Sequence, residues 1–259
     1  MLFRSPCNDN NVCTTPDTCQ AGVCVGTPVS GACTDHYMCY KIRPAAFLPI
    51  LGVSLNDEFE NITVDVRKVK ILCPPASKNG EPVLDSVTHQ EAYTFKGVSG
   101  TPKFGRRFGI HINDQFGPLV VDLLRRDLLL VPANKSLSGT PSAPDNDQIA
   151  VDHFKCYKVK ISSGTPKFVP QTVGVTDQFI GNTAKSFVLK KVKHFCTPVD
   201  KNHEGRKNPA GYLTCYQAKP ASGQPKHVRR VVNTNDQFGP LVLGTIKEAE
   251  LCVPSVRTP

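Results

Sequence analysis

The sequence contains no tryptophan, only two methionines and no long apolar run. A membrane-spanning helix needs about 18 or more consecutive apolar residues, so none is predicted. The first residues, MLFRSPCN, lack the apolar segment of a signal peptide. Either Met1 is not the biosynthetic start, or the chain is a mature or partial product.

The motifs of common enzyme classes are also missing. The sequence has no H-E-x-x-H, G-x-S-x-G, G-x-x-x-x-G-K-[ST] or G-x-G-x-x-G. Its 22 acidic residues show no paired arrangement typical of glycosidases. Few windows of ten residues are free of proline, glycine and β-branched clusters, which is unfavourable for helices. We therefore expect a helix-poor protein that is not an enzyme.

Cysteine, by contrast, is abundant. Five of the eleven cysteines fall within the first 33 residues, and six follow at long intervals. A thiolate metal site needs C-x-x-C knuckles, and the chain has none. This usage indicates disulfides formed in an oxidising compartment, so we expect an extracellular or cell-surface protein.

Four segments of the chain share one pattern. A common phenylalanine recurs at Phe59, Phe116, Phe179 and Phe238, at intervals of 57, 63 and 59 residues. The first and third segments continue into PASKNGEP and PVDKNHEG, whereas the second and fourth share NDQFGPLV. This ABAB order predicts two tandem domains, residues 35–140 and 151–259, each of two related halves and joined by a linker at 141–150.

Within a segment, one cysteine opens the pattern and another closes it. The predicted disulfides are Cys39–Cys73, Cys156–Cys196 and Cys215–Cys252. In the second segment Ala92 and Leu130 stand at these two positions, as expected if the cysteines are partners. Each bridge closes a loop of 34 to 40 residues, worth about 3–4 kcal/mol in the chain-entropy description.

The local periodicity is that of β-strands. Tyr157, Val159 and Ile161 alternate with lysines, as in a half-buried strand. Gly-Thr-Pro, Ser-Gly and Asn-Gly clusters separate such runs at short intervals. The predicted fold is mainly β: two tandem antiparallel β-sandwich or barrel domains, preceded by a small disulfide-rich module at residues 1–34.

The repeat residues CYKVK, TDQF or NDQFG, LC-x-P and KNGE resemble a domain of unknown function in secreted proteins of Gram-negative bacteria. The resemblance covers about residues 35–259 and implies no activity. Residues 7–26, CNDNNVCTTPDTCQAGVCVG, are similar to tandem repeats of the form C-D-D-x-N-x-C-T-x-x-D-x-C-x-x-G-x-C-x-G in large secreted bacterial proteins. That similarity implies a small disulfide-held module, often one of several.

The cysteines of the N-terminal module leave several pairings open. Cys7, Cys13, Cys19 and Cys24 are expected to pair among themselves, with three possible connectivities. Cys33 is then predicted to be free or bonded to another chain. The alternative is that one of the four is unpaired and Cys33 takes its place.

Oxygen-bearing side chains between these cysteines predict a calcium site at Asp9, Asn11 and Asp17, because Ca²⁺ prefers several oxygen ligands on a constrained loop. The spacing is not that of an EF-hand. The alternative is that these residues cap turns through their own backbone.

Other polar residues recur with the repeat. Asp57, Asp114, Asp177 and Asp236 each precede the shared phenylalanine by two residues. We interpret them as structural, with the aspartate holding a turn and the phenylalanine entering the core. His36 and His153 occupy equivalent places before a strand, and His194 aligns with Ile71, so these histidines are also interpreted as structural.

The net charge of +9 makes an acidic polymer a candidate partner. Basic residues come as scattered pairs at 106–107, 125–126, 190–191 and 229–230. Aromatic residues are not interleaved with them as in nucleic-acid modules, so we expect no nucleic-acid partner and favour solvated strand faces. The leading hypothesis is an extracellular structural protein, a self-associating subunit of a bacterial surface filament or matrix assembled head to tail. The alternative is a secreted adhesin module that binds a glycan or polyanion.

Overall fold

The computed structural model describes residue 7 and residues 14–20, 23–28, 34–43, 46–146 and 149–258. The regular elements in these ranges are strands and not helices. They are β1 (Thr14–Gln20), β2 (Val23–Pro28), β3 (His36–Arg43), β4 (Ile50–Asn56), β5 (Asn61–Cys73), β6 (Pro75–Lys78), β7 (His89–Gly97), β8 (Arg107–Asp114), β9 (Gly117–Ser136), β10 (Phe154–Ile161), β11 (Gln171–Thr176), β12 (Lys185–Pro198), β13 (Asp200–Lys201), β14 (Tyr212–Pro220), β15 (Val231–Asp236) and β16 (Gly239–Arg257). The expected mainly β class is confirmed.

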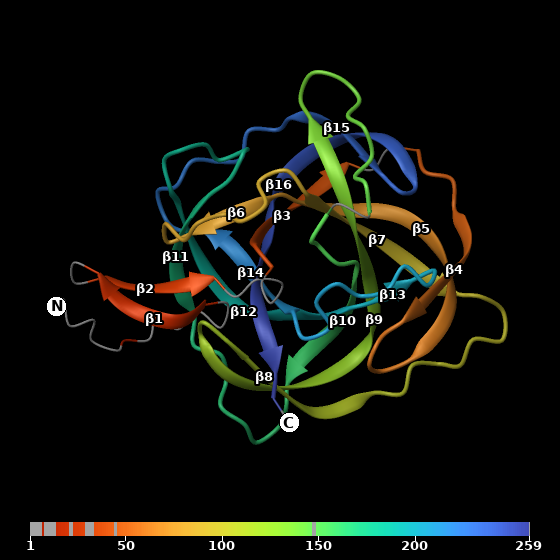
Figure 1. Ribbon diagram of the computed structural model, residues 1–259, viewed down its shortest axis with the longest axis horizontal. Coiled ribbons are helices and arrows are strands. Elements are labelled where there is room, and N and C mark those ends of the chain that lie inside the picture. The colour runs from red at the N-terminus through yellow and green to blue at the C-terminus, as the bar shows by residue number, and fades with distance from the viewer. Residues whose placement is uncertain are drawn as a thin grey trace.

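Long strands form a closed antiparallel ring, visible around the centre of Figure 1. Its order is β3–β5–β7–β9–β10–β12–β14–β16, and β16 pairs again with β3. Two neighbouring strands of the ring come from each repeat. The repeats are called units one to four below and span residues 36–78, 89–136, 154–201 and 212–257.

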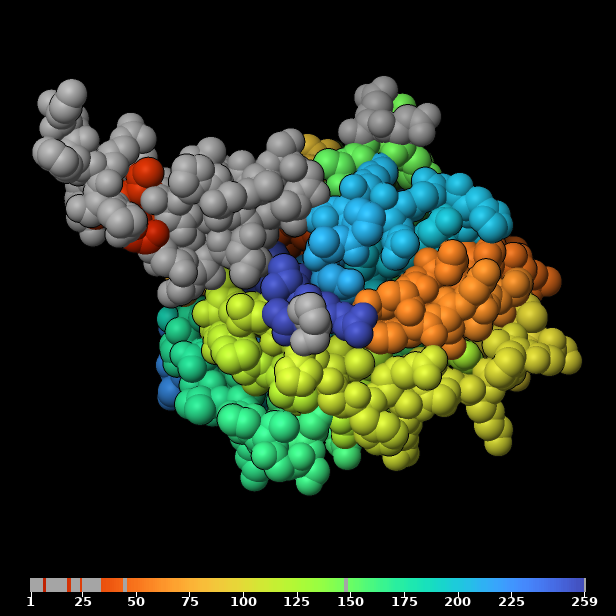
Figure 2. Space-filling view, turned by 60° about the horizontal axis from the view of Figure 1, so that its bottom comes forward, coloured from red at the N-terminus to blue at the C-terminus, as the bar shows by residue number. Residues whose placement is uncertain are grey.

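Shorter strands tie opposite units together outside this ring. β4, β8, β11 and β15 each pair with the second ring strand of their own unit. Units one and three exchange pairings through β4–β13 and β6–β11, and units two and four through β8–β16 and β9–β15. In Figure 2 the end of β16 (dark blue) accordingly lies between the β8–β9 region (yellow) and residues 200–212 (cyan).

The division into two tandem domains is not confirmed by this topology. β9 of the first half pairs with β10 of the second along the whole of β10, and β16 pairs with β3. One apolar cluster contains buried residues from both halves, from Met38 to Val253. Residues 141–150 therefore connect two parts of one sheet. The four units are arranged around the ring with pseudo-fourfold symmetry, because each contributes the same two strands in the same order.

The ring strands have a different core on each face. One face packs against the outer hairpins and forms the main apolar core. The other face turns toward the ring centre, where a second cluster gathers residues from all the ring strands, including Cys39, Cys156 and Cys252. The residual space there is small, about 10 Å³, so the side chains fill the centre.

Disulfides occupy much of this central cluster. The structure joins the cysteines that open and close units one, three and four: Cys39–Cys73, Cys156–Cys196 and Cys215–Cys252. Sulfur atoms of neighbouring bridges approach to 3.7 Å between Cys39 and Cys252. In unit two, Ala92 lies opposite Leu130 in the ladder between β7 and β9 and in the same cluster. An apolar pair thus fills the place of the fourth bridge.

The unit-two pair provides a direct test of this equivalence. We expect the double substitution Ala92→Cys/Leu130→Cys to form a fourth disulfide in air, because directly paired residues of antiparallel strands place their Cβ atoms within bridging reach. Intact-mass measurement with and without thiol alkylation will report it. A variant that folds but retains, after oxidation, two more free thiols than the parent protein would contradict the pseudo-fourfold arrangement.

Candidate functional site

The four recurring aspartates connect opposite units. One carboxylate oxygen of each accepts a hydrogen bond from the amide of the phenylalanine two residues later, at 2.7–3.1 Å. The other oxygen accepts a hydrogen bond from a buried tyrosine hydroxyl at 2.6–2.8 Å. The pairs are Tyr40–Asp177, Tyr93–Asp236, Tyr157–Asp57 and Tyr216–Asp114. The structural role expected for these aspartates agrees with this geometry.

Two aromatic groups flank each tyrosine. The phenylalanine of the Asp-x-Phe motif meets the tyrosine ring edge-on, with centroids 5.0–5.4 Å apart. A second ring comes from the preceding unit: Phe47 on Tyr93, Phe104 on Tyr157, Phe168 on Tyr216 and His227 on Tyr40. The recurring GTPKF, GTPKF and GQPKH segments before Phe104, Phe168 and His227 carry this signal in the sequence. Each tyrosine therefore joins three units.

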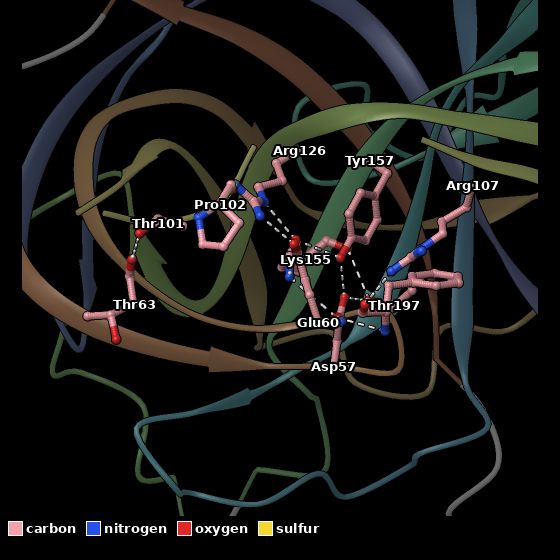
Figure 3. A network of polar contacts seen from close by, with 11 residues as sticks. Asp57, Glu60, Thr63, Thr101, Pro102, Arg107, Arg126, Lys155, Tyr157 and Thr197 are labelled. Atoms are coloured by element: carbon pink, nitrogen blue, oxygen red, sulfur yellow. Dashed lines mark hydrogen bonds and ion pairs between the residues drawn. The ribbon is translucent and has the colours of Figure 1, made fainter. Parts of the chain in front are cut away.

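The most extensive polar network surrounds Tyr157, as Figure 3 shows. The fully buried Lys155 ammonium lies 3.3 Å from Asp57 and 2.8 Å from Glu60. Arg126 donates two hydrogen bonds to Glu60, and Thr197 donates one to Asp57. Burial opposes ionisation of Glu60, but the hydrogen bonds from Arg126 and Lys155 lower its pKa overall. The two cations and two carboxylates of the network neutralise one another, so we interpret it as structural.

A second buried group carries two carboxylates. The Tyr93 hydroxyl lies 2.6 Å from Glu91 and 2.8 Å from Asp236. A tyrosine has one proton to donate, so a second proton must sit on one of the carboxyls. Burial raises the pKa of Glu91, and burial together with the Glu91 charge raises the pKa of Asp236 to about 8. The pair therefore retains a proton near neutral pH.

A histidine stands three residues before the opening position in three of the units. His36 lies 2.6 Å from Glu81, and His153 lies 3.0 Å from Gln237. His89, three residues before Ala92, is the equivalent residue of unit two and was not among the residues predicted from the sequence. Burial lowers the pKa of all three, to about 3 for His89 and His153. They are neutral, buried strand-start residues, in agreement with the structural interpretation of His36 and His153.

His194 closes one end of the central disulfide cluster. Its ring nitrogens lie 2.7 Å from Glu250 and 2.9 Å from Asp127, on two other strands of the ring. Burial alone would lower the pKa of His194, but these carboxylates raise it to about 9. The equivalent positions of units one and two are Ile71 and Leu128. A charged triad thus takes an apolar position, and Arg125, 2.9 Å from Asp127, balances its second carboxylate.

Exposed cations recur on the cysteine-bearing face of the ring strands. Four residues after each opening position stand Arg43, Lys96, Lys160 and Lys219. Five residues before each closing position stand Lys68, Arg125, Lys191 and Lys247. Side chains alternate along a strand, and a bulge before each closing position returns the residue five places earlier to the face of the cysteines, so both sets share that face and lie beyond the closed cluster. Spacing from the cysteines is a sequence signal that would have revealed them.

Some of the cations on this face form ion pairs with carboxylates and others do not. On β9 and β10, Arg125 and Lys158 lie near Asp127, and Lys160 lies near Asp122. On the six adjacent strands β12, β14, β16, β3, β5 and β7, ten cations form no ion pair with a carboxylate in the described ranges. We call these ten the basic rim: Lys41, Arg43, Lys68, Lys70, Lys96, Lys190, Lys191, Lys193, Lys219 and Lys247.

Within the rim, like charges are held close together. Lys41 on β3 is the direct ladder partner of Lys247 on β16, and Lys41 also pairs with Ile71, the neighbour of Lys70. Like charges on directly opposed strand positions are destabilising. The rim is the strongest candidate for a functional surface, because it concentrates the excess charge of the chain on one face.

The N-terminal module is described only in part. Cys7 is bonded to Cys24, which selects one pairing among those left open by the sequence. Cys19 forms no disulfide with a described cysteine, and Cys13 and Cys33 lie outside the described residues. Asp9 and Asn11 lie outside them too, and of Asp17 only the backbone position in β1 is described. Calcium binding there remains a prediction.

In the described ranges, no group of three or more His, Cys, Asp or Glu side chains is arranged to hold a metal ion. The same ranges contain no helix that could cross a membrane. Comparisons with family models, curated proteins and solved structures gave no match. The disulfides are consistent with an extracellular protein.

The shared proton of Glu91 and Asp236 predicts a pH effect on stability. Their pKa values are raised on folding, so the stabilisation is complete below pH about 4 and is lost as the pH rises through about 8. Glu91→Gln removes one of the two charges. Relative to the parent protein, we expect this variant to gain about 1–2 kcal/mol of unfolding free energy between pH 5 and pH 8.

Urea denaturation at both pH values measures this difference. The matched control is Asp122→Asn, because a hydrogen bond from Ser162 helps to lower the pKa of Asp122, which is therefore ionised throughout this window. Its effect on stability should not vary between pH 5 and pH 8. A constant difference for Glu91→Gln as well would contradict the shared proton.

Proposed function

We propose that the protein is an extracellular module that binds an anionic polymer, such as an acidic polysaccharide, through the basic rim. The single observation that carries the proposal is the arc of ten unpaired cations on six adjacent strands. A repeating polyanion presents charges at regular intervals, and recurring cations around a ring are complementary to such a ligand. The surface is also suited to long-range attraction, which falls with added salt.

The fold itself supports a binding module. The disulfide cluster and the cross-unit tyrosines fix the ring strands, so the rim cations start from well-defined backbone positions. Preorganised charges lose less conformational entropy on binding than charges on a mobile segment. The absence of tryptophan is compatible with this mode, since recognition by charge needs no aromatic platform.

The filament hypothesis remains a second prediction of the sequence. Head-to-tail assembly through strand addition needs an open sheet edge. Each ring strand already has a neighbour on both sides, and the outer strands are partly covered by exchanged pairings. These features favour polymer binding over edge-to-edge assembly of the described part.

The test uses heparin and polygalacturonate as sulfated and carboxylated probes. We expect the native protein to bind at least one of them at 50 mM NaCl, with an affinity that falls steeply as salt rises. Lys41→Gln/Lys247→Gln should weaken binding and reduce the slope of log affinity against log salt by about one unit per lysine. Fluorescence anisotropy of labelled polymer provides the measurement.

The same variant should unfold at an equal or slightly higher denaturant concentration, because the substitution removes a repulsive pair. The matched control, Arg125→Gln/Lys160→Gln, loses the same net charge from the acid-accompanied part of the face and should change the affinity much less. An equal loss of affinity in both variants would show that binding reflects total charge and not the rim.

A further inference from the structure

Unit four carries an open groove beside its outer hairpin. It has a volume of about 400 Å³ and lies where β15 and β16 meet the end of β3. Arg43, Arg229 and Arg230 line it together with the apolar side chains of Val231, Val242 and Ile246. Val231 and Val242 are 67% and 57% exposed, which is high for apolar residues on strands.

The outer hairpins of the units differ in whether a carboxylate stands at the position of Gly244. Gly244 of unit four corresponds to Asp65 and Asp122 of units one and two. Those carboxylates accept hydrogen bonds from the amides of Gly52 and Gly109, at 3.3 Å and 3.2 Å. Both amides lie where the ladder is bulged, whereas the ladder between β15 and β16 continues without a shift. Unit four therefore has neither the bulge nor the acid; unit three, with Val188 at the equivalent position and an unshifted ladder between β11 and β12, lacks both as well.

The loss of this acid changes the charge balance. In unit two, Asp122 lies 3.4 Å from Lys160, its ladder partner on the next strand. In unit four the ladder partner of Gly244 is Arg43. Neither Arg43 nor Arg229 nor Arg230 forms an ion pair with a carboxylate of the described part of the chain. Three guanidinium groups thus share an apolar groove without a counter-charge.

The base of the groove is polar at a place where the other units are apolar. Thr245 corresponds to Val66, Leu123 and Leu189. Its hydroxyl is 2.8 Å from His227 and accepts a hydrogen bond from the Arg230 amide at 2.9 Å. The Thr245 amide in turn donates to the Arg230 carbonyl at 2.8 Å. These bonds hold the segment that carries Arg229 and Arg230 against the groove.

We propose that this groove binds one small anionic amphiphile, a carboxylate, sulfate or sulfonate attached to an apolar body. The anion takes the place that the aspartates occupy in units one and two, within reach of the three arginines. The apolar body covers Val231 and Val242. The volume is that of a small-molecule site, so the ligand is a single dissolved molecule and not a membrane surface. This inference does not depend on polymer binding by the rim.

The probe is 8-anilinonaphthalene-1-sulfonate, whose fluorescence rises in apolar surroundings. We expect saturable binding with a stoichiometry of one at the groove. N-phenyl-1-naphthylamine has the same aromatic body without the sulfonate and should bind at least about tenfold more weakly, because hydrogen bonds to charged groups carry the difference. Equal affinity for both probes would overturn the anion requirement.

Two pairs of variants locate the site. Arg229→Gln/Arg230→Gln should weaken sulfonate binding roughly tenfold or more. Arg106→Gln/Arg107→Gln removes the arginine pair of unit two and should leave the affinity within about twofold. Gly244→Asp restores the acid of units one and two and should abolish binding, whereas Gly244→Ala should retain it.

Both Gly244 substitutions are compatible with the fold, because an added Cβ meets Arg43 at an ordinary contact distance of 3.7 Å and the backbone is not in the left-handed region. Unchanged binding by Gly244→Asp would overturn the proposal. Vesicles with an anionic lipid test the other source of the same chemistry: binding to vesicles but not to the dissolved probe would also overturn it. Arg43 belongs to both surfaces, but Lys41 and Lys247 lie outside the groove lining, so loss of heparin binding in the rim variant with retained sulfonate binding would show that the two kinds of binding are separable.

Discussion

Each tyrosine that follows an opening position donates its buried hydroxyl to an aspartate from the unit across the ring, and the arrangement of the whole sheet depends on these four hydrogen bonds. The carboxylates of Asp57, Asp114 and Asp236 are buried and that of Asp177 is partly buried, and each also holds the turn that carries its own phenylalanine. Loss of the hydroxyl would leave a buried acceptor without its partner, a penalty of about 1–3 kcal/mol. Because every tyrosine joins three units, no unit can leave the ring without breaking contacts in the others.

The centre of the ring imposes a second constraint. Directly opposed residues of the ring strands turn toward one another there, and the space admits little beyond sulfur atoms and small apolar groups. Three disulfides satisfy this condition, and Ala92 with Leu130 satisfies it without a covalent bond. His194 then caps the cluster as a cation between two carboxylates. Unit two lacks the disulfide but keeps an apolar pair in its place, so the centre is packed there without a covalent bond.

The sequence predicts local features well because they repeat. The strands, the cysteines that open and close a unit, and the turn role of the aspartates all follow from residues within one unit. The division into two domains does not follow from residues within one unit. The ABAB similarity matches the strand pairings between units: units one and three exchange pairings with each other, and so do units two and four. Similar sequences occur where the contacts are reciprocal, across the ring and not along the chain. Six of the ten rim cations stand at a recurrent spacing from the cysteines, which was not recognised from the sequence, and only the strand pairing shows which cations lack an acid.

Departures from the pseudo-fourfold pattern are of two physical kinds. Ala92 and Leu130 replace one apolar group by another and preserve the central packing. Around Tyr40, polar residues replace apolar ones. His227 takes the position of a phenylalanine, Thr245 that of an aliphatic residue, and Glu248 that of Val69 and Val192. Glu248 is buried and must be balanced by Lys185, at 2.5 Å, although buried ion pairs are often no more stabilising than apolar packing. Stability alone does not account for this polar cluster, because Val69 and Val192 show that the fold accepts an apolar residue at the position of Glu248. The cluster lies beneath the arginine groove and fixes its floor through Thr245, so the exchange of apolar packing for hydrogen bonds is explained by the position that it gives to Arg230.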